Sequence, residues 1–194
     1  MEKEGRLTLD LLKLIDTDAH VTQRRLANEL GIALGLANSY LRRCIRKGFV
    51  KVKAVPTNRY TYYLTPSGMA EKSVLVARYL SYSLQFYREA RGQCEDAFRT
   101  CGERGWTRVA VCGLGDLGEI AVLSAREFQV DTVGPVDMED GRADQAILDD
   151  LHAKGRLDVV LLADLTHPQA AHDRLCRLVD PDRILLLPML EVRR

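Results

Sequence analysis

A glycine-rich stretch near the middle of the chain could bind a phosphate group. Residues 112–119 read CGLGDLGE, and their glycines have the spacing G-x-G-x-x-G. Between a buried strand and a helix, such glycines permit a tight turn, let a phosphate approach the backbone, and let the helix pack on the sheet. The apolar run RVAVCG comes before the stretch, and the helical pattern GEIAVLSAREF continues from it. The cofactor-binding residues expected here are Gly113, Gly115, Asp116, Leu117 and Gly118.

Polar residues after the next two apolar runs could complete this site. Asp137 ends the run DTVGPVD, 24 residues after Gly113, which is about where an acidic side chain holds an adenosine ribose. Thr166 and His167 follow the run DVVLLAD. With the free N–H groups of a helix start, these residues predict that NAD(H) or another nucleotide binds. Asp116 brings negative charge to the phosphate position and counts against binding, so the alternative that the loop is only a turn stays open.

The same pattern does not predict an enzyme. No nucleophile–base pair accompanies His167, and a single histidine on a loop is more often solvated than catalytic. The five cysteines are scattered and odd in number, without a C-x-x-C pair, so we expect neither a metal site nor a disulfide framework. One alternative remains, an oxidoreductase-related fragment whose substrate domain lies in another chain.

Strand and helix patterns alternate from residue 105 to residue 194. Apolar runs at 108–113, 131–137, 158–164 and 183–190 predict strands, and helical patterns lie between them. This alternation is typical of a parallel sheet with helices on its faces. The runs DVVLLAD and RILLLP are apolar throughout, as expected for strands buried on both faces. We therefore expect a Rossmann-like ligand-sensing domain at 105–194.

The first 65 residues predict a different, basic domain. A helix is expected at 7–16, a second from Thr22 to Gly31, and a third from Leu34 to Gly48, followed by a hairpin of FVKVKAV and RYTYYLT. This is the pattern of a winged helix-turn-helix. Residues 1–60 carry 12 Lys or Arg and 6 Asp or Glu, whereas residues 106–194 carry 10 and 16. The basic head suits double-stranded DNA.

The third helix is expected to enter the major groove, with Leu36, Tyr40, Leu41 and Ile45 on its buried side. The residues between them then face outward, where Asn can pair with adenine and Arg with guanine. Later basic residues suit phosphates, and the wing tip suits an adjacent minor groove. The expected DNA-binding residues are Gly35, Asn38, Ser39, Arg42, Arg43, Arg46, Lys51, Lys53 and Arg59.

A long helix, or a pair of helices, is expected at 66–104. It begins at Thr65-Pro66, a capping residue followed by a first-turn proline. Because the chain is short, the apolar stripe of this helix is expected to form a homodimer with a second copy. Cys94 and Cys101 could cross-link two copies, although a buried apolar role is favoured. The stripe consists of Leu75, Tyr79, Tyr82, Phe86, Ala90, Cys94, Ala97 and Cys101.

The segments LANELGIALGLANSYLRRCIRKGFVKV and NRYTYYLTPSGMAEK resemble MarR-type winged helix-turn-helix regulators, in particular the branch associated with exopolysaccharide gene clusters. The resemblance covers residues 7–75 and implies a dimeric transcription factor on a pseudo-palindromic DNA site. Residues 106–190 resemble Rossmann NAD-binding modules, and the order of the two domains is similar to that of the redox-sensing Rex repressors. The segment VDVVLLADLTHPQ also resembles nucleotide-sugar dehydrogenases.

The overall expectation is an α/β chain with a DNA-binding domain at 1–65, a long dimerisation helix at 66–104 and a nucleotide-sensing domain at 105–194. The alternative is a DNA-binding regulator whose second half binds no nucleotide and serves dimerisation or partner docking. No apolar run approaches the ~20 residues that cross a bilayer, and the start MEKEGRLTLD lacks the apolar core of a signal peptide, so a cytoplasmic protein without membrane contact is expected.

Overall fold

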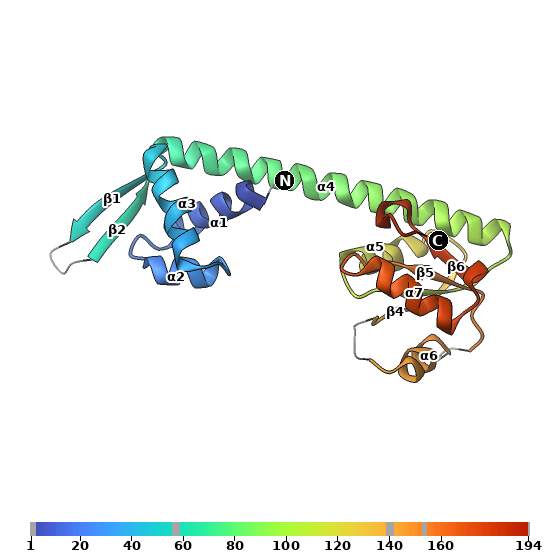
Figure 1. The fold of residues 1–194 in the computed structure, drawn as a ribbon. Helices are drawn as coiled ribbons and strands as arrows, with labels where there is room; N and C mark the ends of the chain where they lie inside the picture. The colour runs from blue at the N-terminus through green and yellow to red at the C-terminus, as the bar shows by residue number, and fades with distance from the viewer. Residues whose placement is uncertain (1–2, 56–58, 139–141, 153–154, 194) are drawn as a thin grey trace. The chain divides into compact units, whose positions relative to one another are not determined.

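The computed structural model describes residues 3–55, 59–138, 142–152 and 155–193. The chain forms two compact units, Met1–Leu84 and Gln85–Arg194, and each has its own hydrophobic core. Helix α4, Pro66–Glu103, runs from the first unit into the second (Figure 1). The boundary between the units therefore falls inside a helix, and residues 66–104 are shared between the two cores.

Three helices begin the first unit: α1 (Lys3–Thr17), α2 (Gln23–Glu29) and α3 (Leu34–Arg46). The side-chain oxygen of Thr22 accepts a hydrogen bond from the N–H of Arg25 at 3.2 Å and so caps the start of α2. Gly31 follows α2 with φ +60°, a left-handed conformation that ends the helix. The predicted helix-turn-helix is thus confirmed.

An antiparallel hairpin completes the predicted wing. Strands β1 (Val50–Val55) and β2 (Arg59–Leu64) pair with Val50 opposite Leu64. The N–H of Tyr62 donates to the carbonyl oxygen of Ala19 at 2.8 Å, which ties the wing to the loop after α1. Residues 56–58 and the side chain of Arg59 lie outside what the structure describes, so the predicted contact at the wing tip is not addressed. The core of this unit includes Leu9, Leu11, Leu12, Ile15, Leu26, Leu41, Cys44, Val50, Tyr62 and Leu75.

The buried side of α3 differs from the predicted one. Leu36 is 46% exposed, and two other members of the predicted stripe are only partly buried. The buried residues of α3 are Ala37, Leu41 and Cys44, of which only Leu41 belongs to the predicted stripe. Small side chains at 37 and 44 let the helix backbone approach its neighbours closely, so α3 is rotated relative to the expectation from its largest apolar residues.

Helix α4 is one continuous helix of 38 residues, about 57 Å long at 1.5 Å per residue. The hydroxyl of Thr65 accepts a hydrogen bond from the N–H of Gly68 at 3.0 Å, and Pro66 is the first helical residue. The predicted start is therefore confirmed, and the alternative of two shorter helices is not observed. No helix in the described part of the chain is both long and apolar enough to span a bilayer.

The predicted dimerisation stripe of α4 is largely used within the chain. Leu75 is buried in the core of the first unit, whereas Ala90, Cys94 and Cys101 are buried in that of the second. The expectation that the whole stripe faces a second copy is therefore wrong at these positions, because each end of the helix covers its own unit. Large apolar side chains that remain at least 39% exposed on α4 are Met69, Val74, Tyr79, Leu80, Tyr82, Leu84 and Tyr87.

The cysteines of the two cores should be unreactive in the folded protein. Burial raises the pKa of Cys94 and Cys112 to about 12 and that of Cys101 to about 11, and it also raises the pKa of Cys44. Since the thiolate is the reactive form, iodoacetamide should label only the partly buried Cys176 in native protein and all five thiols in denaturant, as counted by mass spectrometry. Labelling of Cys94 or Cys101 as fast as Cys176 would contradict their buried placement.

The second unit is built on a four-stranded, all-parallel sheet with the order β4-β3-β5-β6. Counted from its first strand this order is 2-1-3-4, as at the start of flavodoxin-like doubly wound sheets. The Rossmann-like parallel sheet expected from the sequence is confirmed. Its strands are β3 (Arg108–Cys112), β4 (Asp131–Val136), β5 (Val159–Leu162) and β6 (Ile184–Leu186).

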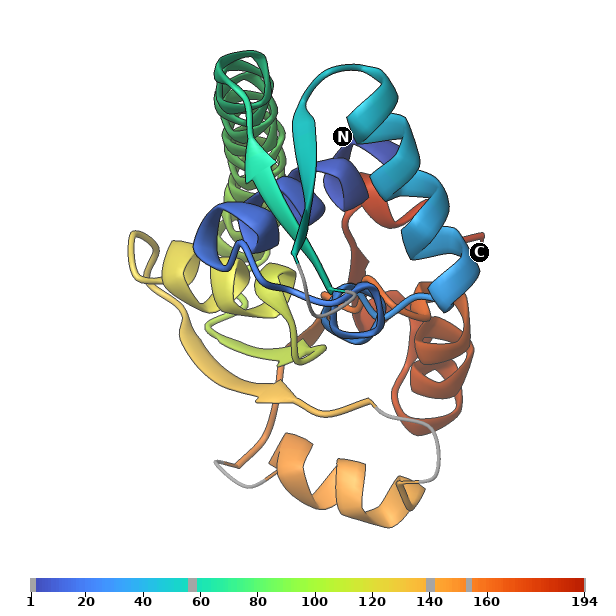
Figure 2. The same cartoon turned by 90° about the vertical axis from the view of Figure 1, so that its left-hand side faces the viewer.

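Helices cover both faces of this sheet. Because parallel crossovers are right-handed and the direction of winding reverses after β4, the helix before β4 falls on one face and the two helices after β4 fall on the other. The second half of α4 and α5 (Asp116–Ala125) lie on one face, and α6 (Asp144–His152) and α7 (Pro168–Leu178) lie toward the other (Figures 1 and 2). Short 3-10 turns, η1 (Pro181–Arg183) and η2 (Pro188–Leu190), flank β6. The sheet thus has both faces covered, which explains the fully apolar and fully buried central strand β5.

Candidate nucleic-acid interface and nucleotide site

One side of α3 carries four exposed residues in a row. Gly35, Ser39, Arg42 and Arg46 follow one another at steps of four, three and four, the spacing that aligns side chains on one helix face. No heavy atom lies within 4 Å of where a Cβ of Gly35 would stand, so the backbone there is open. Recognition helices contact base edges with their first residues. This stripe is therefore the part of α3 best placed to enter a major groove.

Two residues predicted to contact bases do not stand on this outward stripe. The guanidinium of Arg43 forms an ion pair with Glu4 of α1 and lies 5.0 Å from the ring centre of Tyr40. Asn38 is half-buried, and its Oδ1 has no hydrogen-bond partner among the residues that the structure describes. Asn38 lines a cavity of about 310 Å³ between α3 and the hairpin. Arg43 is thus held against α1, whereas Asn38 shares its cavity with Arg42 of the outward stripe.

Exposed cations continue from this stripe onto the hairpin. Lys47 follows α3, and Lys51 and Lys53 stand two residues apart on β1, which puts them on one side of that strand. All three are exposed, and the Nζ of Lys47 lies 5.7 Å from the ring centre of Phe49. Lysine contacts with phosphates give affinity and register without sequence choice. These residues suit the DNA backbone, as predicted for Lys51 and Lys53.

Replacing Lys51 and Lys53 by Ala should weaken binding to operator and random DNA alike. Each lost phosphate contact reduces the steepness of log affinity against log salt by ~0.9, so the slope of the double variant should be shallower by about 2.

Arg42→Ala should instead weaken operator binding by ~1–3 kcal/mol and relax the choice of base at one position. Fluorescence anisotropy across a salt series checks both, with exposed Arg126→Ala in the second unit as the control. If Arg42→Ala binds operator and random DNA as the wild type does, α3 is not the recognition helix.

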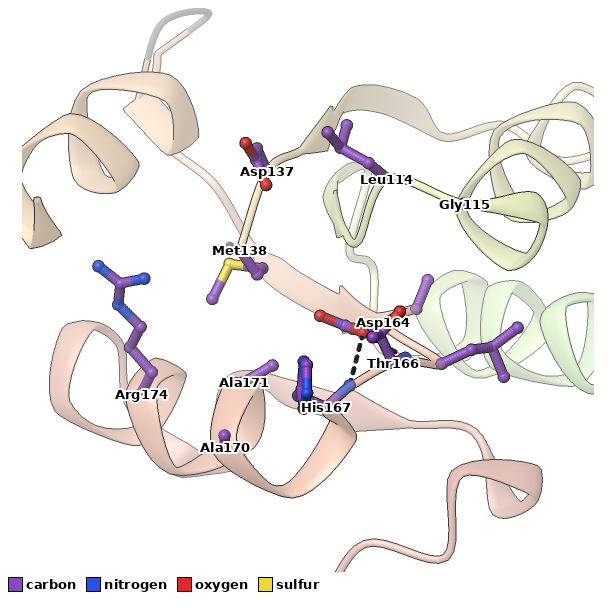
Figure 3. Close-up of a pocket in the computed structure, with 12 residues that line it drawn as sticks. Leu114, Gly115, Asp137, Met138, Asp164, Thr166, His167, Ala170, Ala171 and Arg174 are labelled. Carbon is purple, nitrogen blue, oxygen red and sulfur yellow. Dashed lines mark hydrogen bonds between the residues drawn. The ribbon is translucent and has the colours of Figure 1, made fainter. Parts of the chain in front are cut away.

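A second candidate site lies at the carboxyl ends of the parallel strands. A cavity of about 460 Å³ opens between the loops that follow β3, β4 and β5 (Figure 3). The direction of winding reverses between β3 and β5, and doubly wound sheets bind their ligands at this switch point. Four of the predicted nucleotide-binding residues line the cavity: Gly115, Asp137, Thr166 and His167.

The three glycines of the loop have distinct structural roles. Gly113 has φ +132°, and a Cβ there would lie 2.5 Å from the carbonyl carbon of Ala163. A Cβ on Gly118 would overlap the carbonyl oxygen of Gly113, so these two glycines let the loop, α5 and the loop after β5 pack together. Gly115 differs, because its φ is −155° and nothing lies within 4 Å of the place that a Cβ would occupy. Only Gly115 therefore leaves room for a ligand.

The start of α5 has free hydrogen-bonding capacity. Gly115 is its N-cap residue and provides no side-chain hydrogen bond to the first turn. Asp116 is exposed in that turn and does not line the cavity, whereas the side chain of Leu117 is fully buried in the core. Asp116 and Leu117 could thus contribute only backbone N–H groups to a phosphate.

The loop before α7 is held in a turn by its own aspartate. The Oδ1 of Asp164 accepts hydrogen bonds from the N–H groups of Thr166 at 2.7 Å and His167 at 3.1 Å (Figure 3). Its carboxylate holds the loop against the helix that begins at Pro168. An anion at this helix start would lie close to the Asp164 carboxylate, whose negative charge disfavours it. Neither helix start beside the cavity has a side-chain cap in the described structure, but α7 begins with Pro168, which has no N–H to offer, and only α7 has Asp164 directly before it.

A network of arginines closes the other end of the cavity. Arg174 of α7 is 9% exposed, donates from Nε to Asp144 at 2.7 Å and also donates to the carbonyl oxygen of Arg142. Arg142 in turn donates to the carbonyl oxygen of Asp137 at 3.1 Å and to the carboxylate of Asp150 at 2.5 Å. These contacts tie α7 and α6 to the end of β4 and so fix the backbone that presents Asp137.

The sequence pattern missed several residues of this cavity. Leu114, Met138 and Arg174 line it, although none of them is among the cofactor-binding residues predicted from the pattern. The first two directly follow predicted strands, so the rule that ligands bind at strand carboxyl ends could have found them. Arg174 lies in the second turn of α7 and carries no such signal. Among the described residues no group of three His, Cys, Asp or Glu side chains is arranged to hold a metal ion.

One family model matches part of the first unit. Residues 6–51 match the family model for winged helix-turn-helix DNA-binding domains. A mutant of MepR from S. aureus is similar in structure, with a TM-score of 0.37 and 19% sequence identity over 44% of this chain. The match spans 64% of the MepR chain, less than two thirds of its length. No curated protein matches the sequence. The first unit therefore contains a winged helix-turn-helix DNA-binding domain.

Proposed function

We propose that the chain is a dimeric, MarR-type transcription regulator whose second unit binds a nucleotide. The winged helix-turn-helix provides the contact with DNA. A second copy of the chain covers the exposed apolar side of α4, and a nucleotide in the switch-point cavity changes the affinity for DNA. The observation that carries the nucleotide part is the uncapped start of α5 beside Gly115, at the edge of that cavity.

Several features of the cavity support a nucleotide. Its volume of about 460 Å³ lies in the range of small-molecule sites, roughly 300–1,000 Å³. The N–H groups and positive dipole end of α5 favour a phosphate next to Gly115. Asp137 could accept hydrogen bonds from ribose hydroxyls, and Leu114 and Met138 provide apolar surface for a base. NAD(H) is the first ligand to test.

The charges around the cavity restrict the ligand further. The carboxylate of Asp164 stands directly before α7, so phosphate groups are favoured at the start of α5 rather than at that of α7. Asp137 and Asp164 both line the cavity, and carboxylates accept hydrogen bonds from hydroxyls but repel phosphates. These features favour a ligand with one short phosphate segment between hydroxyl-bearing sugars. Dinucleotides and nucleotide sugars both have this chemistry.

The exposed side of α4 supports a dimer. Leu80, Leu84 and Tyr87 stand at i, i+4 and i+7 on one face of the helix, and they are 53%, 51% and 40% exposed. A run of exposed apolar side chains on one element is typical of an interaction surface. A second copy fits because DNA-binding helix-turn-helix domains commonly act in pairs on two half-sites. This face replaces the predicted stripe, whose ends are buried within the chain.

Native mass spectrometry of the purified protein tests both parts at once. A dimer that carries a nucleotide-sized mass supports the proposal. A dimer without it, and without heat on titration with NAD, NADH, ADP or a nucleotide sugar, would remove the nucleotide part. The second unit would then serve dimerisation or partner docking, the alternative left open by the sequence. A monomer at micromolar concentration would remove the dimer part.

A further inference from the structure

Two leucines are exposed at the start of the recognition helix. Leu34 is 43% and Leu36 is 46% exposed, and both stand in the first turn of α3. Single exposed leucines are common on protein surfaces. These two, however, flank Gly35, where the backbone is open, and they precede the exposed stripe that continues through Ser39 and Arg42. They therefore lie where a recognition helix contacts base edges.

Long polar side chains are scarce in this turn. Asn38 is half-buried beside the hairpin, and Arg43 is paired with Glu4. The outward positions ahead of Arg42 are consequently Leu34, Gly35, Leu36 and Ser39. Only one base presents an apolar group in the major groove, and that group is the 5-methyl of thymine. An apolar first turn is thus matched to thymine rather than to any other base.

We propose that Leu34 and Leu36 recognise thymine 5-methyl groups in each operator half-site. The inference rests on the proposed DNA-reading role of α3 and names the base that its first turn selects. At 100° per residue the two leucines are about 200° apart around the helix, so they contact different base pairs on either side of Gly35. The missing side chain of Gly35 lets the helix backbone approach closely enough for both contacts.

Replacement of thymine by deoxyuridine in the operator tests this directly, because it removes the methyl and leaves every hydrogen-bonding group in place. The operator is first selected from random-sequence DNA with the full-length protein. Deoxyuridine at two positions of the half-site should each weaken wild-type binding about fourfold, the effect of exposing one methyl-sized group. Leu34→Ala and Leu36→Ala should each weaken binding to the thymine operator and lose the discrimination at one of these positions.

Leu123→Ala is the matched control, since Leu123 is 51% exposed on α5 in the other unit. It should leave both affinity and discrimination unchanged. Equal binding of thymine and deoxyuridine operators by the wild type would overturn the inference, as would unchanged discrimination in both leucine variants. If Arg42→Ala still relaxes base choice in that case, DNA reading by α3 stands and only the thymine contact fails. If selection enriches no sequence, the reading role of α3 fails and the inference fails with it.

Discussion

Leu80→Glu combined with Leu84→Glu should convert the protein to monomers and abolish tight operator binding. The two side chains lie one helical turn apart on the exposed face of α4. In the proposed dimer they are removed from water, and burial of unpaired carboxylates costs several kcal/mol. Loss of the dimer separates the two DNA-binding domains, and linked binding of two half-sites contributes a factor on the order of 100 or more. Light scattering and operator titration measure the two effects.

Ser81→Glu combined with Gln85→Glu provides the matched control. This pair has the same spacing and adds the same charge, but it lies one residue, or about 100°, further around the helix. Both side chains are exposed, so the control should remain dimeric and bind the operator. If the Leu80 and Leu84 variant is still a dimer, the second copy binds elsewhere and the proposed role of this face is wrong. If both variants are monomers, added charge on α4 is sufficient and the face is not specific.

The alternation of strands and helices explains why the sequence predicted most of the fold. The winged helix has clear boundaries, since Thr22 caps α2, Gly31 ends it, and the alternating apolar residues from Val50 lie on a strand. In the second unit the buried parts of β3 and β5 are continuous apolar runs between helical patterns. These signals are local, and local signals survive folding because the same residues both form the element and bury its face.

Rotations of helices were not predictable in the same way. The apolar positions of α3 allow two overlapping stripes, and both include Leu41. The stripe with small residues at Ala37 and Cys44 is buried because close packing favours it, whereas Leu36 remains exposed. Likewise, the apolar period of α4 does not tell whether Cys94 faces a second copy or its own sheet. Such choices depend on tertiary packing, which overrides periodicity.

The candidate nucleotide site was predictable in its loop and not in its surroundings. The spacing of the glycines identified the turn, and the structure separates Gly115, which faces open space, from Gly113 and Gly118, which allow close packing. Asp164 holds the loop before α7 through hydrogen bonds to the N–H groups of Thr166 and His167. The sequence contained that aspartate, but its role depends on a loop conformation that residue types alone do not specify.

The distinct roles of the glycines lead to opposite effects of two substitutions. Gly115→Val should preserve the fold, because extended backbone suits a β-branched residue and no atom lies within 4 Å of the new Cβ. It should abolish nucleotide binding, since the valine occupies the phosphate position. Gly118→Ala should instead destabilise the second unit by roughly 1–3 kcal/mol or more, because its Cβ overlaps the carbonyl oxygen of Gly113. Urea denaturation measures the stability, and calorimetry with NAD, NADH, ADP and a nucleotide sugar measures the binding.

Operator affinity separates loss of the ligand from loss of the fold. Gly115→Val should bind the operator as the unliganded wild type does, while nucleotides no longer change that affinity, because coupling between two sites is reciprocal. Asp137→Ala should weaken ligands with a ribose by about 0.5–3 kcal/mol through lost hydrogen bonds, without affecting DNA binding in the absence of ligand. If Gly115→Val binds every ligand as tightly as the wild type, the ligand does not touch the α5 loop. If Gly118→Ala is as stable as the wild type, the loop and α5 do not pack as closely as the three glycines indicate.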